Sequence, residues 1–247
     1  MTRSKPIGNL FMKPAPTNKR LVIVHGDKGG VGKSTVARLL ADYYTSHSLD
    51  WRGYDTDATN GHLLRFYPER TRAIDIHESG SLDQLLNSLE QDGRHWLVDL
   101  GAQGGDKLVA WMAETEFLAV CRELGVSVTI AFVLSPVKDS AVLLKTVADQ
   151  LGSEVSYLVV KNEATGSSFA IYDSSKTKAR LIDDLAAIEI RFPELLEHVY
   201  YKIDKHNLGW SESLQGKTLE LAERQRVKAF LRTSFAELEK AKVFLVS

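Results

Sequence analysis

A glycine-rich segment followed by lysine and two hydroxyl residues carries the strongest chemical signal in the sequence. It is His25-Gly-Asp-Lys-Gly-Gly-Val-Gly-Lys-Ser-Thr35, and it stands between an apolar run at 21–24 and a helix-like pattern at 36–40. Glycines lack Cβ atoms, so successive N–H groups can turn inward around phosphate oxygens, while the following helix directs its positive end at the same charge. The order of strand, glycine loop and helix predicts a phosphate-binding loop.

Each residue of this loop has an expected role on a nucleotide. Lys33 can reach the β and γ phosphates, the Ser34 hydroxyl can ligate Mg²⁺, and Thr35 would contact the α phosphate. The strict motif has a glycine five positions before Gly32, where this chain has Asp27. The loop backbone is expected to bind the nucleotide through Gly29, Gly30, Val31 and Gly32.

The segment Lys28-Gly-Gly-Val-Gly-Lys-Ser34 resembles the deviant Walker A motif of the ParA/MinD superfamily, which an additional early lysine defines. The resemblance implies that Lys28 acts catalytically in trans, reaching the phosphates of the other subunit in an ATP-dependent homodimer. An ammonium group beside the charge that develops on the γ phosphate would stabilise the transition state only where two subunits meet. Nucleotide state and dimerisation are therefore expected to be coupled.

Two acids follow the run at 51–54, in the sequence Tyr54-Asp-Thr-Asp57. This resembles the acidic pair on the second strand of the same family, which implies that Asp57 orients the attacking water and that Asp55 belongs to the metal shell. Side chains two residues apart on an extended segment point to the same side. The Pro-Gln that often follows in the family is replaced here by Ala58-Thr59.

A third acid ends the apolar run His95-Trp-Leu-Val-Asp99, which has the Walker B pattern. An aspartate at the carboxyl end of a strand beside the glycine loop can hold Mg²⁺, so Asp99 is expected to bind the metal together with Ser34. The following Leu100-Gly-Ala-Gln-Gly-Gly105 is a candidate γ-phosphate sensor. Its Gln103 is an alternative to Asp57 for orienting water.

The base is expected to bind near Val159-Val-Lys-Asn162, which resembles the family position where an asparagine amide contacts the adenine edge. The segment 192–195 is expected to complete this pocket. The guanine signature Asn-Lys-x-Asp is absent from the sequence, so ATP is favoured over GTP.

These residues require an α/β fold that brings them together. Short β-branched runs alternate with helix-like stretches, which predicts a three-layer sandwich around a mainly parallel, twisted sheet of about six to eight strands, as in P-loop NTPases. Strands are expected at 21–25, 51–55, 96–100, 126–134, 157–160 and 187–190. Helices are expected at 34–48, 82–91, 107–124, 139–151, 175–187 and 219–244.

Composition narrows the class of protein. The 247 residues suit an extended, proline-containing tail at 1–18 and a single P-loop domain at 19–247. A formal net charge of -1 gives no overall attraction to nucleic acid or acidic membranes. The single cysteine, Cys121, excludes an internal disulfide and cysteine-rich metal sites. The sequence has no secretory signal and no apolar stretch of roughly 20 residues, so we expect a cytoplasmic protein without stable membrane insertion.

The sequence gives weaker evidence for what the nucleotide-dependent dimer would bind. Arg224, Lys228 and Arg232 recur every four residues and could contact DNA phosphates without sequence specificity, or simply form a solvated helix face. A second basic cluster, Arg65, Arg70 and Arg72, has the same two interpretations.

Together these features favour a slowly hydrolysing ATPase switch of the ParA/MinD type that positions or partitions plasmid, DNA or protein cargo with an activating partner protein. The short length suggests a plasmid-maintenance member of the StbB-like sort. Two alternatives stay open at this point: a nucleotide-dependent adaptor with little hydrolysis, and a metabolic ATP-dependent ligase or kinase on the same fold.

Overall fold

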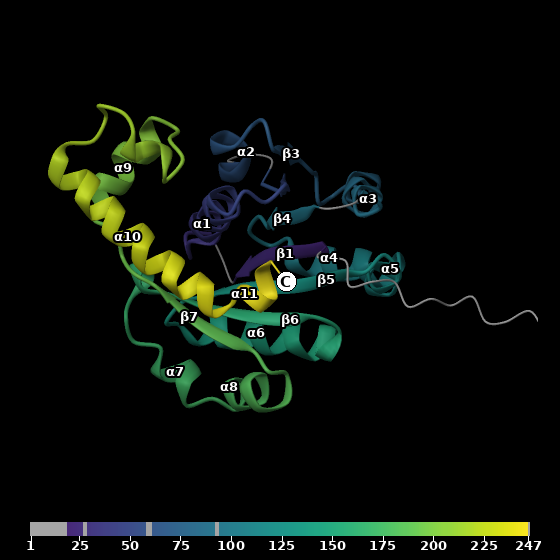
Figure 1. Ribbon diagram of the computed structural model, residues 1–247. Helices are drawn as coiled ribbons and strands as arrows, with labels where there is room; N and C mark the ends of the chain where they lie inside the picture. Colours follow the sequence, from purple (N-terminus) through teal and green to yellow (C-terminus); the bar gives the residue numbers. More distant parts are fainter. Residues whose placement is uncertain (1–18, 27–28, 58–60, 92–93, 247) are drawn as a thin grey trace, which may run out of the picture.

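The computed structural model describes residues 19–26, 29–57, 61–91 and 94–246, so the tail predicted at 1–18 lies outside the described residues. Seven strands form one sheet in the order β3-β2-β4-β1-β5-β6-β7, and every paired neighbour is parallel (Figure 1). This confirms the predicted α/β fold class. The strands are β1 (Lys19–Gly26), β2 (Trp51–Asp55), β3 (Thr71–Ala73), β4 (His95–Asp99), β5 (Val126–Leu134), β6 (Ser156–Asn162) and β7 (Ile188–Phe192).

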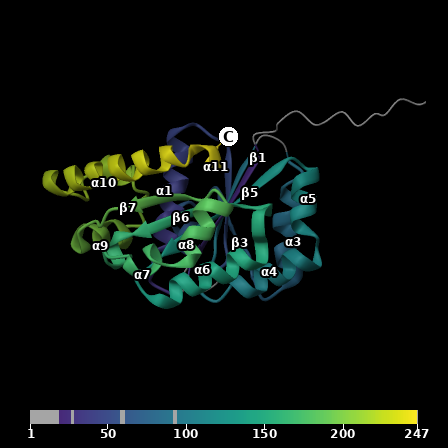
Figure 2. The same cartoon turned by 90° about the horizontal axis from the view of Figure 1, so that it is seen from below.

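Helices cover both faces of the sheet and complete the three layers. Figure 2 shows α10 and α11 on one side of the sheet and α4 and α6 on the other. None of the helices in the described part of the chain is long and apolar enough to cross a membrane. The helices are α1 (Lys33–Ser46), α2 (His62–Phe66), α3 (Ser79–Ser88), α4 (Gly105–Glu114), α5 (Phe117–Glu123), α6 (Lys138–Leu151), α7 (Ala170–Asp173), α8 (Lys176–Ala179), α9 (Glu197–Lys205), α10 (Leu221–Lys240) and α11 (Lys242–Leu245).

Strand β1 lies at the centre of the sheet, between β4 and β5, and is buried along its whole length. Its side chains alternate between two cores: Leu21 and Ile23 pack in the cluster that includes α4 and α6, whereas Val22 and Val24 pack in the cluster that includes α1 and α10. A strand covered on both faces needs a continuous apolar sequence, which is why 21–24 contains no polar residue.

The structure differs from the predicted elements in several places. Helices α2, α7 and α9 were not predicted, and the helix predicted at 219–244 is α10 followed by the separate short helix α11. The edge strand β3 was not predicted, because three residues, two of them exposed, carry no readable alternation. The helix predicted at 107–124 is two helices, α4 and α5, interrupted where Glu116 adopts a left-handed φ of 48°. The helix predicted at 175–187 is α8 followed by a π-helical turn at Arg180–Asp184.

The parallel arrangement gathers the candidate site residues at one edge. Asp55 at the end of β2 is in register with Asp99 at the end of β4, and Asp99 is in register with Val24 just before the glycine loop. In such a sheet, ligands bind outside the carboxyl ends of the strands.

Candidate nucleotide-binding site

The glycine loop has the backbone geometry that a phosphate cradle needs. Gly30 and Gly32 have φ values of 84° and 97°, a region that side-chain-bearing residues rarely enter. Helix α1 begins directly afterwards, at Lys33, and within the described residues no side chain caps its first turn. Its N–H groups are therefore placed for an anionic ligand. Lys28, the predicted trans-acting lysine, lies outside the described residues.

The loop is held from the side by Asn162 at the end of β6. The Asn162 Nδ2 donates a hydrogen bond to the Val31 carbonyl at 2.8 Å, and its Oδ1 accepts one from the Ala164 N–H at 3.3 Å. A Cβ atom on Gly32 would lie 2.2 Å from the same Nδ2. The glycine at position 32 thus serves two purposes, since it allows the left-handed backbone and leaves room for Asn162.

Ser34 and Asp99 meet at the base of the loop. The Ser34 hydroxyl is hydrogen-bonded to the Asp99 carboxyl group, which is only 3% exposed. Burial and the neighbouring Asp55 carboxylate raise the Asp99 pKa to about 7, although Ser34 and Lys33 oppose the shift. A buried carboxyl group with so little compensation is one that a cation would stabilise.

Asp55 has a different environment from Asp99. Its Oδ1 accepts a hydrogen bond from the Asp57 N–H and its Oδ2 accepts one from the Leu64 N–H, both at 3.0 Å. Burial raises the Asp55 pKa, and these N–H donors oppose that shift. The carboxylate thus binds Asp57 just after β2 and Leu64 on α2, and it is not among the residues that line the cavity described next.

A cavity of about 730 Å³ opens over the glycine loop. Its polar lining includes Lys33, Ser34, Asp57 and Asp99, and Thr35 Oγ1 lies 3.4 Å from the Tyr200 hydroxyl in its wall. The lining also includes Asn162, Ala164, Thr165, residues 192–195 and Phe230. A cavity lined by both charged and apolar side chains has the chemistry expected for a phosphate tail and a base.

The two candidates for orienting water occupy different positions. Asp57 lines the cavity, whereas Gln103 is exposed and is not among the lining residues. Gln103 has a φ of 65°, so its backbone forms a turn in the loop after β4.

The oxygen donors of Ser34 and Asp99 fit Mg²⁺. The described residues include no group of three or more His, Cys, Asp or Glu that could hold a metal ion by themselves. This also fits Mg²⁺, which is commonly held by one or two protein oxygens together with phosphate oxygens and water.

The basic residues proposed to contact DNA lie on α10. Lys228 and Arg232 are exposed, while Arg224 is half-buried and its guanidinium donates to the Leu219 carbonyl. Arg224, one of the three residues predicted to contact DNA, therefore already binds the backbone at the start of α10.

Two buried residues near the site were not identified from the sequence. Thr56, between Asp55 at the end of β2 and Asp57, is buried and binds the loop that follows β4. Arg38 is completely buried, beside Tyr200 and Trp210. The position of Thr56 between two candidate acids was a usable signal, but an arginine four residues after Ser34 gave no indication of burial.

Comparisons with known proteins place this geometry in context. No protein-family model matches the chain. Protein MobD of Acidithiobacillus ferrooxidans is 25% identical over 201 residues, covering 80% of this chain and 87% of that protein. A Protein TraL of Escherichia coli is 26% identical over 240 residues, covering 87% of this chain and 95% of that protein.

Among solved structures, the septum site-determining protein MinD of Pyrococcus horikoshii OT3, complexed with Mg-ADP, superposes with a TM-score of 0.57 at 14% identity. The match covers 93% of this chain and 99% of MinD. At this level of identity the match shows the fold, so the fold that the glycine-loop resemblance implied is confirmed: the chain shares the fold of the MinD-type P-loop proteins.

Proposed function

We propose that this chain is an ATP-binding and slowly hydrolysing switch that dimerises with ATP and positions or partitions cargo. The observation that carries the proposal is the convergence of Lys33, the Ser34–Asp99 pair and Asp57 on one cavity over a glycine loop. Such a site has the groups needed to bind a triphosphate and to direct water at its γ phosphate.

Different side chains bind the phosphates and the metal ion in the proposed reaction. Lys33 and the N–H groups of Gly29, Gly30, Val31 and Gly32 neutralise the phosphates, and Thr35 contacts the α phosphate. Ser34 and Asp99 would hold Mg²⁺, with Asp55, in register with Asp99 on the neighbouring strand, as an outer support. When bound, Mg²⁺ neutralises charge on the phosphate oxygens.

Asp57 accepts a hydrogen bond from the attacking water and aims it along the axis of the breaking bond. Lys28 of a second subunit stabilises the charge on the γ phosphate. Asn162 has two amide hydrogens, and we assign the one not held by Val31 to the adenine edge.

Hydrolysis is expected to be slow because the site is completed only in the dimer. A separate activating partner protein would raise the rate. Nonspecific DNA contacts through Arg224, Lys228 and Arg232 are one means by which the dimer could hold its cargo.

Nucleotide titration of the wild-type chain and of Lys33→Ala tests the binding site. We expect Mg-ATP to bind the wild type and to bind Lys33→Ala at least about tenfold more weakly, since one charge-assisted contact to the phosphates is lost. The exposed Lys107 on α4 provides a matched control as Lys107→Ala. Equal affinity in all three proteins would refute the proposal.

Size-exclusion chromatography with ATP and with ADP tests the switch. We expect a dimer with ATP only, and Lys28→Ala is expected to bind ATP yet hydrolyse it more slowly. Binding of ATP without any hydrolysis, with or without DNA, would indicate an adaptor. Turnover that requires a small carboxylic acid or alcohol would indicate a ligase or kinase.

A further inference from the structure

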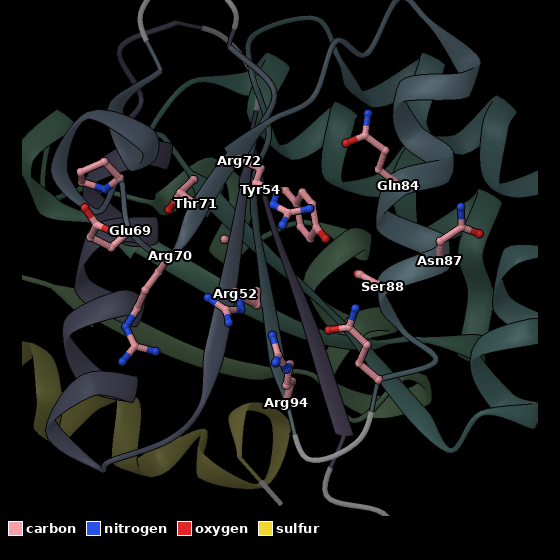
Figure 3. Close-up of a pocket in the computed structure, with 13 residues that line it drawn as sticks. Arg52, Tyr54, Glu69, Arg70, Thr71, Arg72, Gln84, Asn87, Ser88 and Arg94 are labelled. Carbon is pink, nitrogen blue, oxygen red and sulfur yellow. The ribbon is translucent and has the colours of Figure 1, made fainter.

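A second cavity, of about 610 Å³, lies away from the nucleotide site, at the edge of the sheet where β3 is paired only with β2. One wall is formed by β2, β3 and the segments at 68–70 and around 94, and the other by α3. Figure 3 shows Gln84 and Asn87 on α3, with Arg52 and Arg72 on the strand side. We call this cavity the edge groove.

The charge in the edge groove is strongly unbalanced. Among the described residues, four arginines line it and only one carboxylate does, that of Glu69. The four arginines are Arg52, Arg70, Arg72 and Arg94.

Two of these arginines share an acid. Arg70 Nη1 lies 3.8 Å from Asp50 Oδ1, and Arg94 Nε lies 3.4 Å from Asp50 Oδ2. Within the described residues, Arg52 and Arg72 have no carboxylate within ion-pair distance. Two guanidinium groups on the strand wall are therefore available to an anionic ligand.

The facing wall contributes uncharged amides rather than acids. Gln84, Asn87 and Gln91 lie on or just after α3 and are exposed. Primary amides both donate and accept hydrogen bonds, which matches the alternating N–H and C=O groups of an extended peptide. Guanidinium groups bind carboxylates through paired hydrogen bonds.

We propose that the edge groove binds an extended, acidic peptide segment of a partner protein. The carboxylates of the segment pair with Arg52 and Arg72, and its backbone groups bond to Gln84, Asn87 and Gln91. The groove is separate from the nucleotide cavity and shares no lining residue with it. The proposal goes beyond the proposed ATPase function and does not require it.

The observations favour a peptide over a nucleic acid. Single-stranded nucleic acid is normally bound by aromatic rings on which its bases stack. Within the part of the chain that the structure describes, the only aromatic residue lining the edge groove is Tyr54, which is 4% exposed and packs in the core. The chain's own first 18 residues do not complement the groove either, because they contain Arg3, Lys5 and Lys13 and no acid.

Fluorescence anisotropy with a labelled peptide of alternating glutamate and serine tests the proposal. The wild-type chain is expected to bind this peptide, to bind it more weakly as salt is raised, and to ignore the matched glutamine-serine peptide. In the double variant Arg52→Gln/Arg72→Gln, the affinity is expected to fall at least about tenfold, since two charge-assisted contacts are lost. No ion pair within the described residues is broken by these changes, so the melting temperature should stay close to that of the wild type.

The control variant is Arg226→Gln/Lys240→Gln, which removes the same charge from exposed positions on α10. It is expected to retain wild-type affinity for the peptide. A second variant, Gln84→Ala/Asn87→Ala, alters only the helix wall and is expected to weaken binding severalfold without changing the salt dependence. This variant tests the groove even if the arginine variant does not fold.

Three outcomes would overturn the proposal. The acidic peptide does not bind the wild type, or the α10 control loses as much affinity as the groove variant, or neither groove variant differs from the wild type. Binding of an oligothymidine, but not of the peptide, that depends on Arg52 and Arg72 would assign the groove to nucleic acid instead. ATP binding is measured in parallel, so failure of this proposal is distinguishable from failure of the nucleotide site.

Discussion

The Thr56 side chain joins the two loops that flank the nucleotide cavity, because its Oγ1 accepts a hydrogen bond from the Gly101 N–H at 2.7 Å. The Thr56 N–H in turn donates to the Asp99 carbonyl at 3.0 Å. Thr56 thus connects the segment that carries Asp57 with the segment that follows Asp99. Both Asp57 and Gly101 line the cavity, so Thr56 holds two parts of the cavity wall together.

Replacing Thr56 with valine keeps the shape of the side chain and removes the acceptor for Gly101. We expect Thr56→Val to lower the free energy of unfolding by about 1 kcal/mol, because an N–H group that is half-buried loses its partner. Urea denaturation measures this change. Thr56→Ser retains the hydroxyl and is expected to lose less than half as much, and equal losses in the two variants would mean that the hydrogen bond does not contribute.

A second prediction concerns the contact between Gly32 and Asn162. In Gly32→Ala, the new Cβ atom would lie 2.2 Å from Asn162 Nδ2, and the backbone would have to keep a φ of 97°. We expect ATP affinity to fall by at least about tenfold because the loop must move to relieve the contact. Gly80→Ala on α3, where a Cβ meets nothing within 4 Å, is the matched control and should bind ATP normally.

The two costs at position 32 can be separated. Removing the Asn162 side chain in Gly32→Ala/Asn162→Ala relieves the steric contact but leaves the left-handed backbone. Stability is therefore expected to recover partly, with a remaining loss of about 1 kcal/mol relative to Asn162→Ala alone. Full recovery, or none, in urea denaturation would show that only one of the two constraints acts there.

His25 predicts a pH dependence of stability. The ring stacks on Phe132 with centroids 5.4 Å apart, and neither ring nitrogen has a hydrogen-bond partner within the described residues. Burial, and secondarily the Lys33 ammonium, lower the His25 pKa to about 4, while Asp106 opposes the shift. The unfolded chain then binds more protons than the folded chain between about pH 6.5 and pH 4, so the contribution of His25 to stability is complete above 6.5 and declines toward 4.

Chemical denaturation at several pH values measures this contribution. The free energy of unfolding of the wild type is expected to fall with decreasing pH more steeply than that of His25→Asn, by up to about 1.4 kcal/mol per pH unit in this range. His77→Gln, which changes an exposed histidine, is expected to follow the wild type. Identical slopes for His25→Asn and the wild type would contradict the burial of a neutral imidazole.

The sequence predicted the centre of this fold better than its edges. Strands such as β1 and β5 are buried on both faces, so their apolar runs are visible without knowledge of their neighbours. The short edge strand β3 forms because it pairs with β2, and three residues are too few to show the alternating apolar and polar pattern of a strand. The break at Glu116 is likewise not marked in the sequence, because no glycine or proline stands between 106 and 124.

In the candidate site, too, the positions set by central strands were predictable and the contacts made by loops were not. Motif spacing brought Lys33, Ser34 and Asp99 to one cavity, since adjacent parallel strands fix their positions. The bonds from the Leu64 N–H to Asp55 and from Asn162 to the Val31 carbonyl were not predictable, because they depend on how α2 and the glycine loop fold back against the strand ends.

Arg38 connects the nucleotide site to the C-terminal helices. It lies on α1 and is fully buried, with its guanidinium carbon 3.4 Å from the Phe66 ring centroid and 4.4 Å from that of Trp210. Its Nη2 donates to the Leu208 carbonyl at 3.3 Å, and Asp204 lies 3.8 Å from Nη1. A single cation thereby joins α1 to α2 and to the segment that follows α9.

We expect Arg38→Ala to lower the free energy of unfolding by about 3–5 kcal/mol, because it leaves a cavity between two rings and removes the buried partner of Asp204. Arg38→Lys should recover less than half of the loss, since an ammonium group cannot stack on both rings. Arg65 also pairs with Asp204, at 2.6 Å, but its side chain is 40% exposed. Arg65→Ala is therefore the matched control, with an expected loss below about 1 kcal/mol. Equal losses in urea denaturation of Arg38→Ala and Arg65→Ala would show that the ion pair with Asp204, rather than the stacked and buried guanidinium, holds these helices together.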